Sequence, residues 1–359
     1  MTARWVFLGL SLSSSWGNGH ATTYRSLIAA LAERGNQILF LERDCPWYAA
    51  HRDLRDPGFC ELKFYNDLNA LAAQRERIEQ ADVVVVGSYV PDGAEICRLV
   101  QQWARGVVAF YDIDTPVTLA RLDRGDEGHL SRDCIAGFDL YLSFTGGPTL
   151  QRLERDYGAR SAYALYCAAD PKIHRPTGAQ PQWDLGYIGT YSPDRQPELE
   201  RLLFGVAECL PDSSFVVVGP QYPSGIAWPA NVEHIEHLSP AQHAEFYSSL
   251  RWVLNLTRAE MKLTGYSPSV RLFEAGACGV PIISDYWSGL ETIFRVGSEI
   301  TVAESVEQIV QTLTLGARDQ LGAAARRRVL GEHTAVRRAY ELEVQVKAAR
   351  RRLPASRAA

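Results

Sequence analysis

The chain has 359 residues, 46% of them hydrophobic and 22% charged, with a formal net charge of -5 and a pI near 5.9. This length suits about two globular domains, and the acidic balance argues against a dedicated nucleic-acid-binding protein. The 7 cysteines are scattered without a CxxC pair, which favours reduced thiols over a disulfide framework or a zinc site.

The apolar run at residues 5–10 is followed by serines and glycine, which favours a first strand over a signal peptide. No run of apolar residues approaches the roughly 18 that a membrane helix needs. We therefore expect a cytoplasmic protein without a transmembrane segment.

Strand-like and helix-like runs then alternate along the first half, which predicts an α/β fold with a parallel sheet. After the first strand we expect a loop at 11–19. The expected elements that follow, in chain order, are a helix at 20–34, a strand at 37–41, a helix at 70–80, strands at 82–87, 107–111 and 140–144, and a helix at 148–155.

A polar segment at 172–183 with two prolines suits an interdomain linker, and the alternation restarts after it. The expected elements are strands at 185–188, 214–218, 232–235 and 251–256, and helices at 196–209, 240–250, 306–315 and 318–340. Two Rossmann-like domains follow from this pattern, and ligands bind such sheets at the carboxyl ends of the strands. We place the domains at 1–170 and 171–335, with a C-terminal helix and basic tail at 336–359.

Residues 265–285 contain the most informative motif. Ser267 suits an N-cap, Pro268 a first helical residue and Gly279 a helix stop, and a short buried strand follows. The N–H groups and dipole of such a helix N-terminus favour anions. Glu274 lies inside the helix, where its carboxylate can accept hydrogen bonds from a sugar diol.

The stretch 273–284 resembles the donor-site signature of GT-B glycosyltransferases, closest to the group 1 type and its spore-maturation (CgeB-type) relatives. The resemblance implies two Rossmann-like domains that face a central cleft and close on the donor. It also implies a nucleotide diphosphate sugar as co-substrate, no cofactor, no catalytic metal, and a last helix that returns to the first domain. The matching glutamate, Glu274, binds the ribose in that family. A second family glutamate, eight residues earlier, is replaced here by Tyr266.

Further donor-binding residues follow from the same resemblance. The stretch 188–195 is similar to the family's glycine loop, so Gly189 is expected near the diphosphate and Arg195 at a phosphate-binding position. Gly219 and Leu238 are expected beside the nucleotide base.

Cations flank the predicted helix N-terminus. Arg258, Lys262 and Arg271 are candidates to neutralise the leaving diphosphate, with Ser267 and Ser269 at the helix start. A surface position is the alternative for each cation taken alone.

The loop 13–20 follows the first strand. It carries the acceptor-side candidates Gly17, Asn18 and Gly19, but no third glycine completes a dinucleotide-binding GxGxxG motif. The resemblance implies that this loop faces the acceptor. His20 is then a candidate general base, since imidazole titrates near neutral pH. The alternative is a histidine that only shapes the start of a helix.

Asp112 and Asp114 follow a predicted buried strand, where α/β proteins place functional groups. Either carboxylate can bind substrate hydroxyls or act as a base. The alternative is a turn in which Asp114 or Thr115 caps a helix.

These features predict a glycosyltransferase, of hexosyltransferase type, with catalytic candidates His20, Asp112 and Asp114. A nucleotide-sugar epimerase and a non-catalytic nucleotide-sugar-binding protein of the same fold stay open. A nicotinamide dehydrogenase is disfavoured by the incomplete glycine motif. We expect no stable nucleic-acid partner. The basic tail is best explained as a solvated helix face, with peripheral membrane contact as the alternative.

Overall fold

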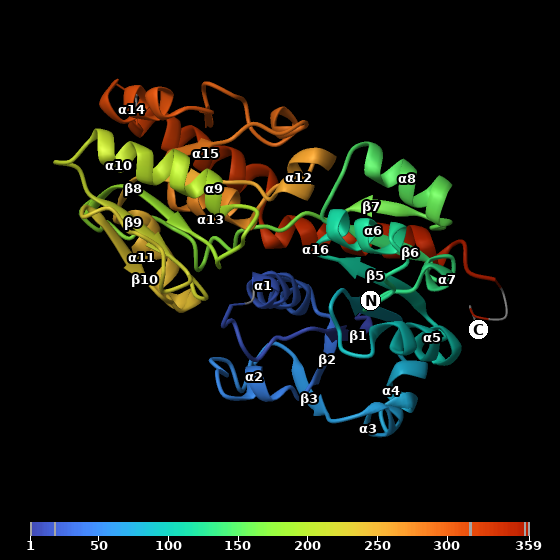
Figure 1. The fold of residues 1–359 in the computed structure, drawn as a ribbon. Helices are drawn as coiled ribbons and strands as arrows, with labels where there is room; N and C mark the ends of the chain where they lie inside the picture. The colour runs from blue at the N-terminus through green and yellow to red at the C-terminus, as the bar shows by residue number, and fades with distance from the viewer. Residues whose placement is uncertain (1, 18, 316–317, 355–356, 358–359) are drawn as a thin grey trace. The chain divides into compact units, whose positions relative to one another are not determined.

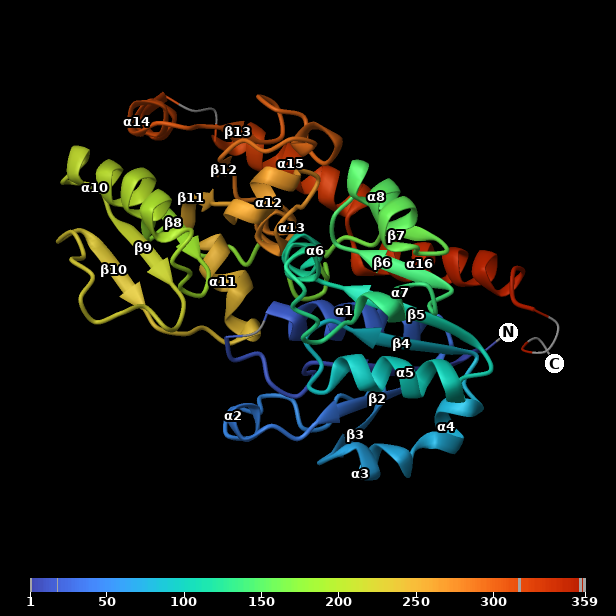
Figure 2. The same cartoon turned by 45° about the vertical axis from the view of Figure 1, so that its right-hand side comes forward.

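The computed structural model describes residues 2–17, 19–315, 318–354 and 357. The chain folds into two compact units (Figures 1 and 2): unit 1 joins Met1–Tyr166 to Ala335–Ala359, and unit 2 is Cys167–Thr334. The boundaries expected from the sequence, at 170 and 335, lie four residues and one residue later. The predicted fold class is confirmed, because each unit contains one parallel sheet with helices packed on it.

Unit 1 contains a 7-stranded sheet in the order β3-β2-β1-β4-β5-β6-β7. The strands are β1 (Arg4–Gly9), β2 (Gln37–Arg43), β3 (Glu61–Tyr65), β4 (Val83–Gly87), β5 (Val107–Asp112), β6 (Leu140–Ser143) and β7 (Ala162–Ala164). Four valines and a glycine make up β4 and all are buried, because a central parallel strand is covered on both faces. The strand order reverses at β1 and β4, where α/β sheets bind ligands.

The helices of unit 1 come from both ends of the chain. They are α1 (Gly19–Glu33), α2 (Pro46–Ala49), α3 (Leu68–Ala72), α4 (Arg75–Glu79), α5 (Gly93–Trp103), α6 (Thr115–Asp123), α7 (Arg132–Ile135), α8 (Pro148–Tyr157) and α16 (Ala335–Arg350). The C-terminal α16 packs against α1 and contacts β5 and β6 (Figure 2). Arg34 Nη2 also donates to Glu343 Oε2 at 2.7 Å, which ties the end of α1 to α16.

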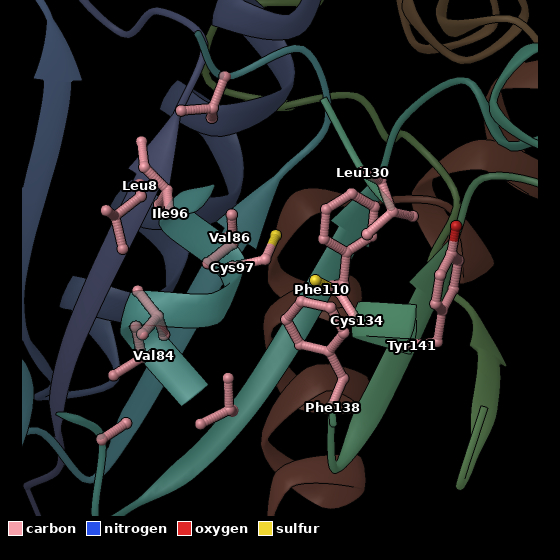
Figure 3. Close-up of a cluster of buried hydrophobic side chains, with 14 of the residues drawn as sticks. Leu8, Val84, Val86, Ile96, Cys97, Phe110, Leu130, Cys134, Phe138 and Tyr141 are labelled. Atoms are coloured by element: carbon pink, nitrogen blue, oxygen red, sulfur yellow. The ribbon is translucent and has the colours of Figure 1, made fainter. Parts of the chain in front are cut away.

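One buried cluster of unit 1 lies between the sheet and the helices α5 and α7 (Figure 3). Its members include Leu8, Val84, Val86, Ile96, Cys97, Phe110, Leu130, Cys134, Phe138 and Tyr141. Full burial of one such large apolar side chain stabilises a fold by about 1.5–3 kcal/mol. Cys97 and Cys134 behave here as small apolar residues rather than as a redox pair.

Unit 2 contains a 6-stranded sheet in the order β10-β9-β8-β11-β12-β13. The strands are β8 (Trp183–Ile188), β9 (Phe215–Val218), β10 (Val232–Ile235), β11 (Leu250–Asn255), β12 (Ile282–Ser284) and β13 (Thr301–Val302). The first and last residues of this unit lie side by side. The Ala169 N–H donates to His333 O at 3.1 Å, and Ala169 pairs with Thr334 in a parallel bridge.

The helices of unit 2 include the predicted donor-site helix, α13. They are α9 (Gln196–Leu199), a π-helical turn η1 (Glu200–Phe204), α10 (Gly205–Cys209), a 3-10 turn η2 (Pro240–Gln242), α11 (His243–Ser248), α12 (Ala259–Thr264), α13 (Val270–Cys278), a 3-10 turn η3 (Leu290–Thr292), α14 (Val306–Leu315) and α15 (Arg318–Glu332). Helix α13 packs against α11 and α15. Gly279 ends α13 at a φ of 77°, as predicted.

Four predicted helices are divided in the structure. The helix expected at 240–250 is the 3-10 turn η2 followed by α11. The helix expected at 70–80 is α3 and α4, because Gln74 leaves the helical region at φ -96° and ψ 5°. The helix expected at 196–209 contains the π-helical turn η1. The helix expected at 318–340 ends at Glu332, because Thr334 adopts the extended backbone of its bridge to Ala169.

None of the described helices is both long and apolar enough to cross a membrane.

Candidate functional site

The carboxyl ends of β8 and β9 approach each other closely in unit 2. Gly219 has a φ of 155°, and a Cβ added there would lie 2.0 Å from Gly189 O. Glycine is therefore required at 219 by both conformation and space. Both glycine carbonyls are hydrogen-bonded. Gly189 O accepts the Tyr222 hydroxyl at 3.2 Å, and Gly219 O lies 3.0 Å from His234 Nε2. The loop from β10 to η2 carries Leu238, which is half-buried.

Arg271 joins the ends of two strands. Its side chain is 5% exposed, Nε donates to Ile188 O at 2.7 Å, and Nη1 donates to Asn255 Oδ1 at 2.8 Å. Its guanidinium carbon also lies 4.4 Å from the centre of the Tyr187 ring. The predicted phosphate-binding cation is thus engaged by the protein on several sides, and it positions the ends of β8 and β11.

Helix α13 begins later than predicted. Its N-cap is Ser269 rather than Ser267, and the Ser269 hydroxyl donates to Asn255 Oδ1 at 2.6 Å instead of capping the helix. The hydroxyl of Ser267 is buried and donates to Gly265 O at 3.0 Å. The side chain of Ser269 therefore does not occupy the N–H groups at the start of α13, although the Leu272 N–H donates to Ser269 O at 3.2 Å.

Tyr266 has an unusual backbone conformation, with a φ of 51°. Its N–H donates to Ser288 O at 2.6 Å, and its ring packs on Gly289, where an added Cβ would lie 2.4 Å from Tyr266 Cδ1. A left-handed conformation in a residue other than glycine costs about 1–3 kcal/mol and persists where the surroundings enforce it. Such positions cluster at binding sites, which fits the loop before α13.

Arg258 is the N-cap of α12, and Lys262 lies within that helix. Arg258 Nε lies 3.9 Å from Asp194 Oδ2, and Lys262 Nζ lies 3.3 Å from Asp285 Oδ2. Both cations keep about a third of their side-chain surface exposed, at 31% and 35%, so they can also reach an anion. Arg195 Nη2 donates to Thr190 O at 2.8 Å and thereby closes the loop after β8.

Asp194 and Asp285 are partners that the sequence analysis did not select. Asp285 is 2% exposed and accepts the Thr257 N–H at 3.1 Å and the Thr257 hydroxyl at 2.8 Å. Its place at the end of a predicted strand was a usable signal, because carboxyl ends of parallel strands gather functional groups.

Glu274 is 3% exposed and is surrounded by a tyrosine and two histidines. Tyr247 Oη donates to Oε2 at 3.1 Å, His174 Nε2 lies 3.4 Å from Oε1, and His243 Nδ1 lies 3.7 Å from Oε2. Burial by itself raises the pKa of Glu274, but the histidines and Tyr247 outweigh it and bring the pKa to about 2. The carboxylate is therefore ionised at neutral pH and accepts hydrogen bonds.

The two histidines beside Glu274 were not foreseen. His174 lies in the segment predicted as a linker, and His243 is the first residue of α11. Burial lowers the pKa of His174, with Glu274 opposing that shift. The sequence spacing of His174, His243 and Glu274 does not predict their contact, because tertiary folding brings the three residues together.

Asp112, at the end of β5 in unit 1, has no exposed surface. Its Oδ2 accepts the Tyr141 hydroxyl at 2.6 Å, and its Oδ1 accepts the Thr118 hydroxyl at 2.9 Å and the Asp114 N–H at 3.3 Å. Burial raises the pKa of Asp112 to about 6. These contacts hold the loop that carries Asp114.

His20 and Asp114 lie in the same part of unit 1. The His20 ring, in the first turn of α1, lies 5.4 Å from the Tyr89 ring, and Tyr89 Oη donates to Asp114 Oδ2 at 3.2 Å. Burial lowers the pKa of His20, and the Asp114 carboxylate opposes that shift. Asp114 also occupies the N-cap position of α6, as the alternative interpretation predicted, but its side chain makes no capping hydrogen bond.

The loop before His20 is held by a buried carboxylate that the sequence analysis missed. Glu42, at 0% exposure, accepts the N–H groups of Leu12 at 2.6 Å and Ser13 at 2.9 Å. Gly17 has a φ of 60°, and Gly19 is the first residue of α1. The candidate Asn18 lies outside the described residues.

Comparison with known families identifies one match. Residues 195–343 match the model of the family described as glycosyl transferase-like. No curated protein matches the chain at a significant level.

Solved structures of the same fold cover nearly the whole chain. A sucrose-phosphate synthase from Thermosynechococcus elongatus has a TM-score of 0.68 at 14% identity. The match covers 97% of this chain and 100% of the synthase chain. HepE from Anabaena in complex with UDP-glucose has a TM-score of 0.71 at 11% identity, with coverages of 96% and 100%. An alpha-glucosyltransferase in complex with UDP-glucose and DNA containing an abasic site has a TM-score of 0.73 at 13% identity, with coverages of 97% and 100%.

Proposed function

We propose that this chain, which has the GT-B fold and carries a glycosyl transferase-like domain over residues 195–343, transfers a sugar from a nucleotide diphosphate sugar to an acceptor. The observation that carries the proposal is the structure of α13. This helix offers N–H groups at its N-terminus that Ser269 does not cap, and it holds the buried, ionised carboxylate of Glu274 one turn further along.

The diphosphate and the ribose of the donor each have a proposed partner in unit 2. The diphosphate binds the N-terminus of α13, where peptide dipoles and N–H groups favour anions, and Arg258 and Lys262 of the α12 region add charge. Negative charge grows on the diphosphate as the glycosidic bond breaks, so these groups stabilise the transition state more than the ground state. Glu274 accepts hydrogen bonds from the ribose hydroxyls.

Structural relatives support the donor class. HepE and the alpha-glucosyltransferase hold UDP-glucose in their solved structures, so we propose a uridine diphosphate hexose as donor. Gly189, Gly219 and Leu238 then border the nucleotide through backbone groups. The reaction needs the nucleotide sugar as co-substrate and no resident cofactor.

The acceptor is assigned to unit 1. His20, whose ring lies against Tyr89 and whose pKa burial lowers, is largely uncharged at neutral pH and can accept a proton from an acceptor hydroxyl. Asp114 stabilises the imidazolium that forms. Asp112 does not contact substrate in this proposal, because its carboxylate is fully buried.

The test is binding and hydrolysis across a panel of nucleotide sugars, followed by mass spectrometry and calorimetry. Glu274→Gln keeps the size of the side chain and is expected to weaken binding of UDP-glucose by about 10- to 100-fold, since hydrogen bonds to charged groups contribute about 1.5–3 kcal/mol. Glu245→Gln on the exposed face of α11 is the matched control.

The panel also separates the alternatives. Slow release of free sugar from one donor supports a transferase, whereas conversion of the donor sugar to its epimer identifies an epimerase. Binding without turnover in the presence of candidate acceptors favours a non-catalytic binding protein. Failure of the folded protein to bind any nucleotide sugar excludes the proposal.

A further inference from the structure

The three side chains around Glu274 have the chemistry of a metal site. Within the described ranges, His174, His243 and Glu274 form the one group of three metal-ligating residue types whose ligand atoms lie within 4.8 Å of one another. Two imidazoles and a carboxylate are a frequent ligand set for zinc and related divalent ions. Ligand atoms bound at about 2.0–2.1 Å in a tetrahedral site lie about 3.4 Å apart, so the more distant ligand atoms must move inward when the ion binds.

His174 provides an independent observation. Its side chain is 7% exposed and faces Glu274, but neither ring nitrogen makes a well-formed hydrogen bond among the described residues. A buried imidazole that makes no well-formed hydrogen bond costs stability, so the position of His174 calls for an explanation. Its Nε2 lies 3.4 Å from Glu274 Oε1, which is the separation of two neighbouring ligands in a tetrahedral zinc site.

The histidines are held in place by ordered backbone. The His174 N–H donates to Asp170 O at 2.7 Å, and His243 begins α11, which packs on α13. His243 Nδ1 is also without a hydrogen-bond partner in the described part of the chain, and it lies 3.7 Å from Glu274 Oε2. Three separate segments of unit 2 thus direct one ligand each to the same point.

We propose that His174, His243 and Glu274 bind a divalent ion of the zinc class, and that the bound ion withdraws Glu274 from the donor. The ion coordinates the carboxylate that the ribose otherwise uses, so metal and nucleotide compete. The competition rests on the proposed function, whereas the metal site does not. The ion is an inhibitor in this proposal and takes no part in sugar transfer.

Metal binding is measured first, on the full chain stripped with EDTA and without nucleotide. Titration with Co²⁺ is expected to produce the visible absorption bands of a tetrahedral site with one equivalent of metal, and Zn²⁺ is expected to abolish them. His174→Ala and His243→Ala should each weaken Zn²⁺ binding by at least about 100-fold, since removal of outer partners of metal ligands already costs 10- to 100-fold. His51→Ala, an exposed histidine of unit 1, is the matched control.

Unchanged Zn²⁺ affinity in folded His174→Ala protein, or no Co²⁺ spectrum from the wild type, overturns the site. The wild-type spectrum requires no variant, so the result does not depend on whether a variant folds. Mg²⁺, which prefers oxygen ligands, should not compete.

Competition is measured second, with UDP as the probe. UDP is expected to bind the EDTA-treated wild type, to lose at least about 10-fold in affinity when one equivalent of Zn²⁺ is present, and to be insensitive to Zn²⁺ in His174→Ala. Equal UDP affinity with and without bound Zn²⁺ overturns the competition. UDP binding that fails even in EDTA, with the Co²⁺ spectrum intact, excludes the proposed function and leaves the metal site standing.

Discussion

Tyr247 donates its hydroxyl hydrogen to Glu274 Oε2 at 3.1 Å, and the two side chains are 0% and 3% exposed. The pair joins α11 to α13 and leaves a charge inside the fold. A buried carboxylate is stable only while such partners replace the water it has lost. The strength of this bond therefore contributes both to the stability of unit 2 and to the state of the proposed ribose ligand.

Tyr247→Phe removes the hydroxyl and keeps the ring. We expect a loss of about 1.5–3 kcal/mol in the free energy of unfolding, because a buried charged acceptor loses a hydrogen bond. Chemical denaturation followed by circular dichroism measures the change. Tyr286→Phe removes a hydroxyl from a side chain that is 42% exposed and is expected to stay within about 0.5 kcal/mol of the wild type. Equal effects of the two substitutions would contradict a special role of the buried bond.

Asp112 should make stability depend on pH. Its pKa is about 6 in the folded chain against 3.8 for the unfolded residue, so the native state binds the proton more tightly. The resulting stabilisation is present below about pH 4 and is lost as the pH rises through 6. The free energy of unfolding of Asp112→Asn minus that of the wild type is therefore expected to be about 2 kcal/mol higher at pH 7.5 than at pH 4.5. Urea denaturation at both pH values checks this, and a difference independent of pH would refute the shift.

Gly219→Ala should be strongly destabilising. The added methyl group would meet Gly189 O at 2.0 Å in a backbone conformation that L-residues avoid. We expect a loss of about 2–4 kcal/mol and weaker UDP binding, since the ends of β8 and β9 must separate. At Gly225 an added Cβ meets nothing within 4 Å, so Gly225→Ala is the control and should be close to neutral. Thermal unfolding of the three proteins in parallel provides the comparison.

His20→Gln should separate catalysis from donor binding. We expect transfer to an acceptor to fall by at least about 100-fold, which is the usual contribution of a general base, while UDP affinity remains within about 2-fold of the wild type. The second expectation follows because His20 belongs to unit 1, whereas the proposed donor ligands belong to unit 2. Calorimetry with UDP and a transfer assay test the two parts. A parallel loss of both would indicate that His20 supports the fold instead.

The fold was predictable because it is encoded by local patterns. Short β-branched runs such as Val83–Gly87 alternate with amphipathic runs closed by glycine, and that alternation alone indicates parallel sheets. Gly279 is confirmed as the end of α13 for the same local reason. The break at Gln74 and the extended backbone at Thr334 were missed, because tertiary packing overrides helix propensity there.

The candidate site was predictable only in outline. The motif around Glu274 identified the helix, but its partners His174, His243 and Tyr247 come from other segments and share no spacing with it. Arg271 was selected as a phosphate-binding cation, and its sequence position could not show that Ile188 and Asn255 already occupy its guanidinium. A motif specifies residue types along the chain, whereas the partners of a buried charge depend on the completed fold.

The pairing of Ala169 with Thr334 has a consequence for synthesis on the ribosome. Unit 2 begins and ends at this one place, and it is inserted between α8–β7 and α16 of unit 1. Residues 167–334 can therefore complete their sheet as soon as they emerge, whereas α1 must wait for α16, which follows unit 2 in the sequence, to cover it. Unit 2 should therefore become protease-resistant before unit 1, whose first strands precede it in the sequence, is finished.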